Sequence, residues 1–463
     1  MSRGTPAPFA WRRPPELDGR PPFPAKVAIV GAGPIGLALA LDLATHGVAS
    51  VVLDDNDTVS VGSRAICWAK RSLEILDRLG VGARMAAKGV TWKVGRVFDG
   101  AREVFAFDLL PEDGHKMPAF VNLQQYHVEA YLVERAAAFP GLIDLRWRNA
   151  VTGHADLGDR VRVEVETPEG PYALEADWLV ACDGARSATR ARMGLALRGQ
   201  AFEDRFLIAD VEMTADFPAE RRFWFNPPFH AGQTALLHKQ PDDIWRIDLQ
   251  LGPEADPAAE ARPEAVAPRI ARAVEGRPFR LDWVSVYLFR CARLDRFVHG
   301  RVIFAGDSAH VVSPFGARGG NGGLHDVDNL GWKLAAVVRG AAPAALIASY
   351  DAERGRGADE NIRHSTRATE FMSPPDAPAR RYRDAVLALA PGAPFARRLI
   401  NSGRLSTPCA LGGLALQTPD PTGDAPLPPG TPWPVARLGV GGLVEGLVGR
   451  FVVLELGVAA PAV

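Results

Sequence analysis

The chain has 463 residues, of which 47% are hydrophobic and 23% charged, and its formal net charge is −1. This is an ordinary globular composition, and a chain of this length can bury the cores of two or three domains. The balanced charge excludes a strongly basic nucleic-acid-binding protein and gives no sign of stable membrane association. The cysteines are too widely spaced for a disulfide scaffold or a CxxC pair, which favours a reducing, cytoplasmic compartment; they are Cys67, Cys182, Cys291 and Cys409.

The first structured segment is expected after residues 1–25, a Pro- and Arg-rich stretch that predicts a flexible tail without a secretory signal. Residues 26–30 are a short β-branched apolar run and predict a buried strand, which a glycine-rich turn ends. Residues 37–46 predict a helix, and residues 48–53 predict a second buried strand. Strand, helix and strand in this order form the βαβ unit of a parallel sheet.

The turn itself, Gly31-Ala-Gly33-Pro34-Ile-Gly36, has the glycine spacing of a dinucleotide-binding loop. Two glycines let the backbone turn tightly and approach a pyrophosphate, and the third lets helix and strand pack closely. The phosphates then lie at a helix N-terminus, where free N–H groups favour anions. Asp54 follows 18 residues after Gly36, where its carboxylate can accept hydrogen bonds from a ribose diol and disfavours a 2′-phosphate. This motif alone leaves FAD and NAD open.

Two later motifs favour FAD over NAD. Asp183-Gly184 and Gly306-Asp307 each follow an apolar strand, expected at residues 178–181 and 301–305. Carboxylates at the C-terminal ends of parallel strands lie in the ligand crevice, where Asp307 can bond a polyol hydroxyl. The glycine loop 316–323 then opens a second helix, whose N-terminus suits the anionic edge of a reduced flavin. A cofactor whose pyrophosphate lies at one helix N-terminus and whose ring lies at the other has to be long.

With these three motifs in this order, the chain resembles the class A FAD-dependent aromatic monooxygenases, which have the p-hydroxybenzoate hydroxylase-like fold. Within that group it is most similar to the phenol and 3-(3-hydroxyphenyl)propionate hydroxylase branch, over residues 25–410. The resemblance implies an α/β fold in which a Rossmann-like FAD-binding domain is interleaved with a mainly antiparallel β-sheet substrate domain. A helical C-terminal region and a partial thioredoxin-like tail are implied to follow.

The implied domain boundaries alternate along the chain. The FAD-binding domain takes residues 26–95, 120–195 and 290–372, and the substrate domain takes residues 96–119 and 196–289. Residues 373–410 form the helical region, and residues 411–463 form a linker with a segment that resembles the opening of a thioredoxin-like domain.

The resemblance also carries the family's cofactor contacts onto this sequence. Arg64 matches an arginine at the start of the first long helix, expected over residues 64–80, and Gln125 matches a glutamine that contacts the flavin nucleotide. The loop before the later helix departs from the family pattern, because Arg318 places a cation there. The implied cofactor-binding residues are Gly31, Gly33, Pro34, Gly36, Asp54, Arg64, Gln125, Asp183, Gly306, Asp307, Pro314, Gly319, Gly320 and Asn321.

The reaction implied by the resemblance is the hydroxylation of a small phenolic substrate. NADH or NADPH, a transient co-substrate, reduces the flavin, and O2 then adds to give a C4a-hydroperoxide whose distal oxygen attacks the ring. The protein has to hold the ring, exclude water and remove the phenol proton. Family members are often dimers, so a homodimer is expected.

The candidates for accepting the phenol proton are Tyr287, His238 and His310. Two of them have plainer interpretations, His310 as a structural residue beside the flavin motif and His238 as an exposed polar residue. Aromatic residues between 200 and 290 are candidates to line a substrate pocket, although aromatic-rich sheets are usually core, and a neighbouring arginine suits a substrate carboxylate. These residues are Trp224, Phe229, Trp245 and Arg246.

Other functions stay open at the level of the sequence. An FAD oxidoreductase without ring hydroxylation, such as an epoxidase or a dehydrogenase, has the same motifs, and so does a catalytically silent flavin-binding protein. An NAD dehydrogenase remains an alternative if only the first motif binds a cofactor. The histidines show no HExxH or HxxxH spacing, so no metal site is expected.

Overall fold

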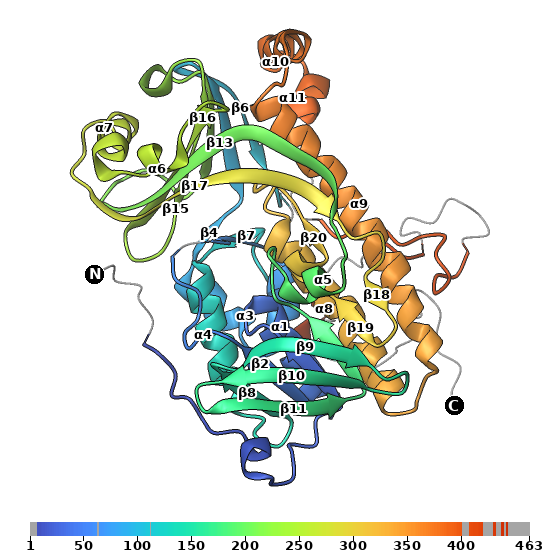
Figure 1. The fold of residues 1–463 in the computed structure, drawn as a ribbon. Helices are drawn as coiled ribbons and strands as arrows, with labels where there is room; N and C mark the ends of the chain where they lie inside the picture. Colours follow the sequence, from blue (N-terminus) through green and yellow to red (C-terminus); the bar gives the residue numbers. More distant parts are fainter. Residues whose placement is uncertain are drawn as a thin grey trace.

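The computed structural model describes residues 7–62, 64–111, 113–400, 407–419, 429–431, 437–438 and 441–442. The lower half of the molecule in Figure 1 is built on a six-stranded sheet in the order β18-β19-β12-β1-β2-β8. Each neighbouring pair is parallel except β18 with β19. The strands are β1 (Val27–Val30), β2 (Ser50–Asp54), β8 (Ile143–Trp147), β12 (Trp178–Ala181), β18 (Val298–His299) and β19 (Val302–Phe304).

The inner strands of this sheet are buried on both faces. Every residue of β1 and β12 is buried, which is why both strands are continuous apolar runs rather than alternating ones. The helices that share this core are α1 (Pro34–Thr45), α4 (Gln125–Ala136) and α8 (Gly319–Val338). The N-termini of α1 and α8 therefore both belong to the layer that covers the parallel strands.

Two small antiparallel sheets are attached to this half. One is inserted in the chain between β8 and β12 and consists of β9 (Ala150–Asp156), β10 (Val161–Thr167) and β11 (Gly170–Ala176). Its middle strand alternates buried apolar and exposed charged residues, as expected for a sheet with one face in water. The other consists of β3 (Cys67–Ala69), β7 (Phe120–Asn122) and β4 (Val90–Trp92).

An eight-stranded sheet forms the upper half of the molecule, in the order β20-β17-β13-β16-β15-β14-β5-β6 (Figure 1). Its neighbours are antiparallel except β14 with β5. The strands are β5 (Val94–Asp99), β6 (Arg102–Asp108), β13 (Arg198–Glu212), β14 (Arg221–Phe225), β15 (Thr234–Lys239), β16 (Ile244–Gly252), β17 (Arg280–Arg293) and β20 (His310–Val311).

Each face of this sheet has its own apolar cluster. One face packs against α7 (Pro263–Ala273), and the other packs against α9 (Ile347–Met372), α10 (Ala377–Leu389) and α11 (Pro394–Ile400). The fold is thus the interleaved α/β arrangement that the sequence implies.

The remaining elements are η1 (Pro15–Asp18), α2 (Lys70–Arg78), α3 (Gly82–Lys88), α5 (Ala188–Arg192), η2 (Pro228–His230), α6 (Pro257–Glu260), η3 (Gly306–Ser308), η4 (Ala344–Leu346), β21 (Arg437–Leu438) and β22 (Gly441–Gly442).

The helix expected over residues 64–80 is shorter in the structure, and that expectation is corrected here. Residues 67–69 pair with β7 as strand β3, and the helix begins only at Lys70. The buried Trp68 indole donates a hydrogen bond to the Leu123 carbonyl, which holds this segment extended. Arg64 therefore lies before a strand and not in the first turn of a helix.

Residues 7–25, expected to be a flexible tail, lie against the edge strand β8. The ring of Phe9 stacks on Trp147 with centroids 4.7 Å apart. Glu16 forms an ion pair with the buried Arg146 at 2.9 Å. An aromatic stack and a shielded ion pair give this stretch a defined place.

Among the described helices, none combines the length and the apolar character that crossing a bilayer requires. The segment that resembles the opening of a thioredoxin-like domain lies mostly outside the described residues.

One buried polar network joins α8 to α9 and provides a test of the packing. Lys333 donates to Glu353 at 2.7 Å and to Asn329 at 2.9 Å, and both charged side chains are almost fully buried. Glu353→Gln leaves the ammonium uncompensated, so we expect a loss of about 3 kcal/mol in the free energy of unfolding. Urea denaturation measures this loss. The double variant Lys333→Met/Glu353→Leu should lose less than Glu353→Gln; a larger loss would contradict the ion pair's role.

Candidate functional site

The glycine turn after β1 combines close packing with open space. An added Cβ at Gly31, whose φ is +103°, would lie 2.6 Å from the Cys182 carbonyl oxygen, and one at Gly36 would lie 2.0 Å from the Gly31 oxygen. A Cβ at Gly33 would meet no protein atom within 4 Å. Gly31 and Gly36 are thus required by the protein's own packing, whereas Gly33 borders space at the N-terminus of α1. This is the arrangement of a turn that receives a ligand's phosphates.

Asp54 ends β2 beside this turn. Its carboxylate accepts hydrogen bonds from the Ala32 N–H at 2.6 Å and from the Asn56 N–H at 2.9 Å. Burial raises the pKa of Asp54, and these backbone donors oppose that shift. The carboxylate is therefore held in a set orientation next to the glycine turn.

Asp307 lies at the C-terminal end of β19, across the sheet from Asp54. Its side chain is exposed and makes no hydrogen bond to any described residue. The surrounding protein nevertheless raises the pKa of Asp307 by desolvation, which Arg64 and His310 oppose. Asp183, at the end of β12, accepts from the Thr189 N–H at 3.0 Å through one oxygen and has its other oxygen buried without a partner.

The start of α8 is fixed by one buried side chain. Asn321 donates to the Cys67 carbonyl at 2.8 Å and accepts from the Ala69 N–H at 2.9 Å, so it ties the helix to β3. The backbone N–H groups of the first turn, which includes Gly319 and Gly320, have no partners within a helix. Before them, the loop that starts at Pro314 passes through a left-handed conformation at Gly316 and Ala317. A second open helix N-terminus results.

Ser60 and Ala65 are both hydrogen-bonded to side chains of α4. Gln125 accepts from the Ala65 N–H at 3.2 Å and donates to the buried Glu129 at 2.8 Å, and Glu129 in turn accepts from the Ser60 N–H. The Arg64 side chain is exposed, and its carbonyl accepts from Arg246 at 3.1 Å. Gln125 thus positions the segment that carries Arg64.

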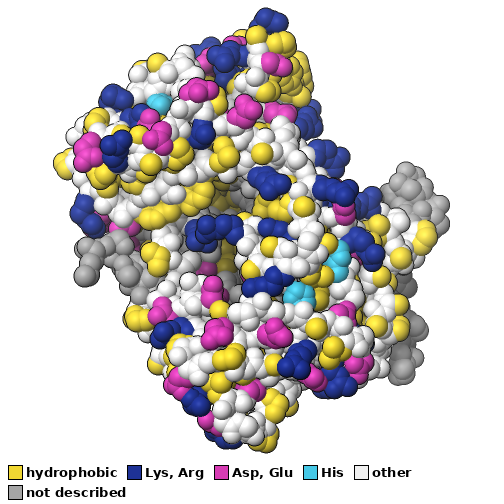
Figure 2. All heavy atoms as spheres, viewed as in Figure 1, with side chains coloured by type: hydrophobic (Ala, Val, Ile, Leu, Met, Phe, Trp, Pro, Cys, Tyr) yellow, Lys and Arg dark blue, Asp and Glu magenta, His cyan; other side chains and the backbone are white. Residues whose placement is uncertain are grey.

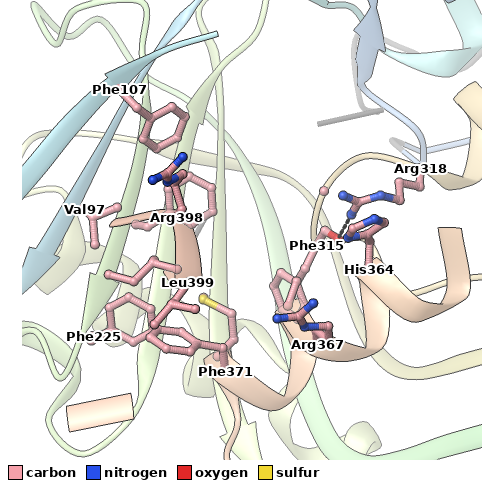
Figure 3. A pocket seen from close by; sticks show the side chains of 15 residues that line it. Val97, Phe107, Phe225, Phe315, Arg318, His364, Arg367, Phe371, Arg398 and Leu399 are labelled. Carbon is pink, nitrogen blue, oxygen red and sulfur yellow. Dashed lines mark hydrogen bonds between the residues drawn. The ribbon is translucent and has the colours of Figure 1, made fainter. Parts of the chain in front are cut away.

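A cavity of about 170 Å³ adjoins the loop that precedes α8. Cavities of roughly 150 Å³ accept benzene, so an aromatic ring fits. In Figure 3, aromatic side chains from the eight-stranded sheet and α9 lie on one side, with Arg318, His364 and Arg367 on the other. The space-filling view shows a hollow between the two halves of the molecule, bordered by basic side chains (Figure 2). The lining includes Val97, Phe107, Phe223, Phe225, Phe315, Phe371, Met372, Arg398 and Leu399.

Polar residues form a row on the face of the eight-stranded sheet that also carries Phe223 and Phe225 of the cavity lining. Arg246 lies opposite His238 on β15 and opposite Asp210 on β13. Its guanidinium bonds the Asp210 carboxylate at 2.9 Å. His238 is 2% exposed, not a solvated polar residue, and burial together with Arg221 and Arg246 lowers its pKa well below 6.5. His238 is therefore neutral at physiological pH.

The other two candidates for accepting the phenol proton lie in different surroundings. His310 is buried and bonds Asp326 at 2.7 Å, while Asp326 also bonds Arg354 at 2.6 Å and the Gly306 N–H at 2.9 Å. Asp326 thus holds both His310 and the Gly306 turn in place. Tyr287 is half-buried against the aromatic cluster of the cavity face, and its hydroxyl makes no hydrogen bond to a described residue.

Three of the aromatic residues proposed for the substrate pocket lie on the opposite face of the sheet. Trp224, Phe229 and Trp245 pack into the cluster under α7. Strand alternation turns Trp224 and Trp245 away from the cavity face, and Phe229, in η2, packs edge-on against Trp224. Only Arg246 of that set faces the cavity side. The alternation Arg221-Arg-Phe-Trp-Phe225 does show that Phe223 and Phe225 share a face, but the sequence does not say which face meets the cofactor domain.

The site contains the open N-termini of α1 and α8 and the unbonded carboxylate of Asp307. Together these features define a protein that binds an extended dinucleotide. Comparison with known proteins agrees: a family model described as an FAD binding domain matches residues 24–365. A 3-(3-hydroxy-phenyl)propionate/3-hydroxycinnamic acid hydroxylase of Mycolicibacterium smegmatis is 31% identical over 82% of this chain and 67% of its own. The 6-methylpretetramide 4-monooxygenase of Streptomyces rimosus is 36% identical over 74% and 60%.

Among solved structures, p-nitrophenol 4-monooxygenase from Pseudomonas putida matches with a TM-score of 0.73 and 26% identity, over 82% of this chain and 98% of that one. The chain belongs to the FAD-binding-domain family of flavoprotein monooxygenases, and its cofactor is FAD. It spans about three fifths to two thirds of the length of the two relatives named above.

Asp326 gives the site a pH-dependent stability. Burial by itself raises the pKa of Asp326, but the pairs with His310 and Arg354 hold it well below the usual range. Because its pKa is depressed in the folded state, ionised Asp326 stabilises the fold above about pH 4. This contribution is lost as the pH falls below about 4 toward the folded-state pKa. Asp326→Asn should therefore cost about 3 kcal/mol at pH 7 and flatten the stability profile between about pH 5 and 3.

Denaturation curves at several pH values measure both effects. Asp359→Asn, which removes an exposed partner of Arg293, serves as the control and should change stability by less than about 1 kcal/mol. Equal losses in both variants would contradict the assignment of Asp326.

Proposed function

We propose that this protein is an NAD(P)H- and O2-dependent monooxygenase that hydroxylates a phenolic ring held in the cavity beside α8. The observation that carries the proposal is one loop, residues 314–318, which lies between an open helix N-terminus and an aromatic-lined cavity of ring size. The similar proteins named above, one hydroxylase and two monooxygenases, support the reaction class.

The described residues fit FAD. In this proposal the N-terminus of α1 and the open side of Gly33 take the pyrophosphate, and Asp54 takes the ribose. The free carboxylate of Asp307 suits the hydroxyl groups of the ribityl chain. The N–H groups at Gly319 and Gly320 suit the electron-rich edge of the ring. Gly31, Gly36, Gly306, Pro314 and Asn321 shape these elements, while Asp183, Arg64 and Gln125 border them.

The protein's own contribution to the chemistry is to bind, orient and shield the substrate. Bound FAD would supply the redox chemistry, in which O2 is activated so that one of its oxygen atoms enters the ring and the other leaves as water. Phe223, Phe225 and Phe315 would hold the ring by apolar contact and exclude water. For the phenol proton we favour Tyr287, whose free hydroxyl borders the aromatic cluster, over His310, whose hydrogen bond is committed to Asp326.

A homodimer and a cytoplasmic location are also proposed. The dimer rests on the family resemblance. The location rests on the need for NAD(P)H and on four free cysteines, Cys67, Cys182, Cys291 and Cys409.

Oxygen labelling tests the proposed reaction directly. The purified protein should be yellow, and a phenol in a broad panel should stimulate its oxidation of NADH or NADPH. With ¹⁸O2, one labelled atom should enter the aromatic product. Oxidation of NAD(P)H without labelled product would favour an oxidoreductase that does not hydroxylate. A flavin that neither nucleotide reduces, even with phenols present, would overturn the proposal.

Two alanine substitutions separate cofactor binding from folding. Gly33→Ala adds a methyl group where no protein atom lies within 4 Å, so the apoprotein should keep its stability while FAD binds roughly tenfold more weakly, about 1.4 kcal/mol. Gly36→Ala places a methyl group against the Gly31 oxygen and should cost up to about 3 kcal/mol of stability. Flavin titration and thermal unfolding measure the two effects; normal FAD affinity in Gly33→Ala would refute the pyrophosphate assignment.

A further inference from the structure

Arg221 is a buried guanidinium that has no hydrogen-bond or ion-pair partner in the described part of the chain. It is 4% exposed, and its Nε and one Nη atom are buried without a hydrogen bond. No carboxylate of a described residue lies within 4 Å of it. A buried charge without a hydrogen-bonded partner is costly, and proteins rarely keep one without a reason. The hydrogen-bonding partner of this guanidinium therefore has to come from outside the described residues.

The neighbouring charges do not satisfy Arg221. Arg246, two strands away, is matched by the Asp210 carboxylate at 2.9 Å. Asp248 influences Arg221 electrostatically but makes no hydrogen bond with it, and one oxygen of Asp248 is itself buried and unpartnered. His238, beside Arg221 on β15, is neutral. None of these side chains supplies the oxygen pair that a guanidinium fork accepts.

Arg221 does not line the cavity itself, but it lies against a side chain that does. Its guanidinium lies 4.8 Å from the centre of the Phe223 ring, and Phe223 lines the cavity. The cavity lining itself contains Arg318, Arg367 and Arg398 and no acidic residue.

We propose that Arg221 is a specificity-determining residue that binds an oxyanion of the aromatic substrate, either a carboxylate or the phenolate itself. The proposal rests on the function proposed above. A planar guanidinium matches a carboxylate through two parallel hydrogen bonds and stabilises a phenolate through one. In either case the substrate supplies the partner that the protein lacks.

Binding titrations on the FAD-loaded protein test this assignment. The change in flavin absorbance reports binding of 3-(3-hydroxyphenyl)propionate, of its primary amide, and of p-nitrophenol at pH values below and above its ionisation. In Arg221→Met, the dissociation constant of the preferred oxyanion should rise about tenfold or more, while that of the matched neutral form changes little. Arg221→Lys keeps the charge and should recover part of the affinity. Loss confined to the propionate identifies a carboxylate site, and loss confined to ionised p-nitrophenol identifies a phenolate site.

Arg222 provides a matched control. It is adjacent in sequence, points to the opposite face and bonds Glu220 at 2.8 Å, so Arg222→Met should leave oxyanion affinity unchanged. Because Arg221→Met removes an unpaired buried charge, its unfolding midpoint should stay the same or rise, whereas a structural residue would lower it.

The possible failures are distinguishable. If none of the three phenols is bound and none stimulates NAD(P)H oxidation, the proposed function fails. If the ligands bind but Arg221→Met weakens both members of a pair equally, or weakens neither, only the Arg221 assignment fails. Loss of FAD from Arg221→Met would assign the residue to the cofactor and would also overturn it.

Discussion

The attachment of α8 to β3 through Asn321 is the constraint on which the site depends. The Asn321 amide donates two hydrogen bonds and accepts a third, and these bonds fix where the helix begins. The position of the helix start in turn fixes both the open N–H groups and the loop that borders the cavity. Further along the same helix, Asp326 forms hydrogen bonds with the Gly306 N–H and with His310. One helix therefore positions the cofactor side, the substrate side and the carboxylate of Asp307 relative to one another.

The eight-stranded sheet divides its chemistry between two faces. Strand alternation sends Trp224 and Trp245 into a closed core under α7, and sends Phe223, Phe225 and Arg246 toward the other half of the molecule. On that second face, polar residues lie in a row beside the aromatic ones. The sheet thus has aromatic and charged side chains side by side on one face, an arrangement that under the proposed function would suit a phenol with its one polar end.

Buried charges in this protein serve two different purposes. Lys333 with Glu353, and Asp326 with His310 and Arg354, are matched within the protein and join its elements. Arg221 has no hydrogen-bond or ion-pair partner among the described residues, and it lies beside Phe223 of the cavity lining. In the proposal above, a substrate oxyanion supplies the partner that the protein lacks.

The sequence by itself determined the nucleotide motifs, because Gly31, Gly33, Gly36 and Asp54 act through backbone geometry over a short stretch of chain. It also determined the class of fold, since apolar runs and glycine turns recur in a set order. Only the tertiary structure decided that residues 67–69 form a strand, that His310 is committed to Asp326, and which face of the large sheet meets the cavity. These outcomes depend on contacts between residues far apart in the chain, and local periodicity contains no information about such contacts.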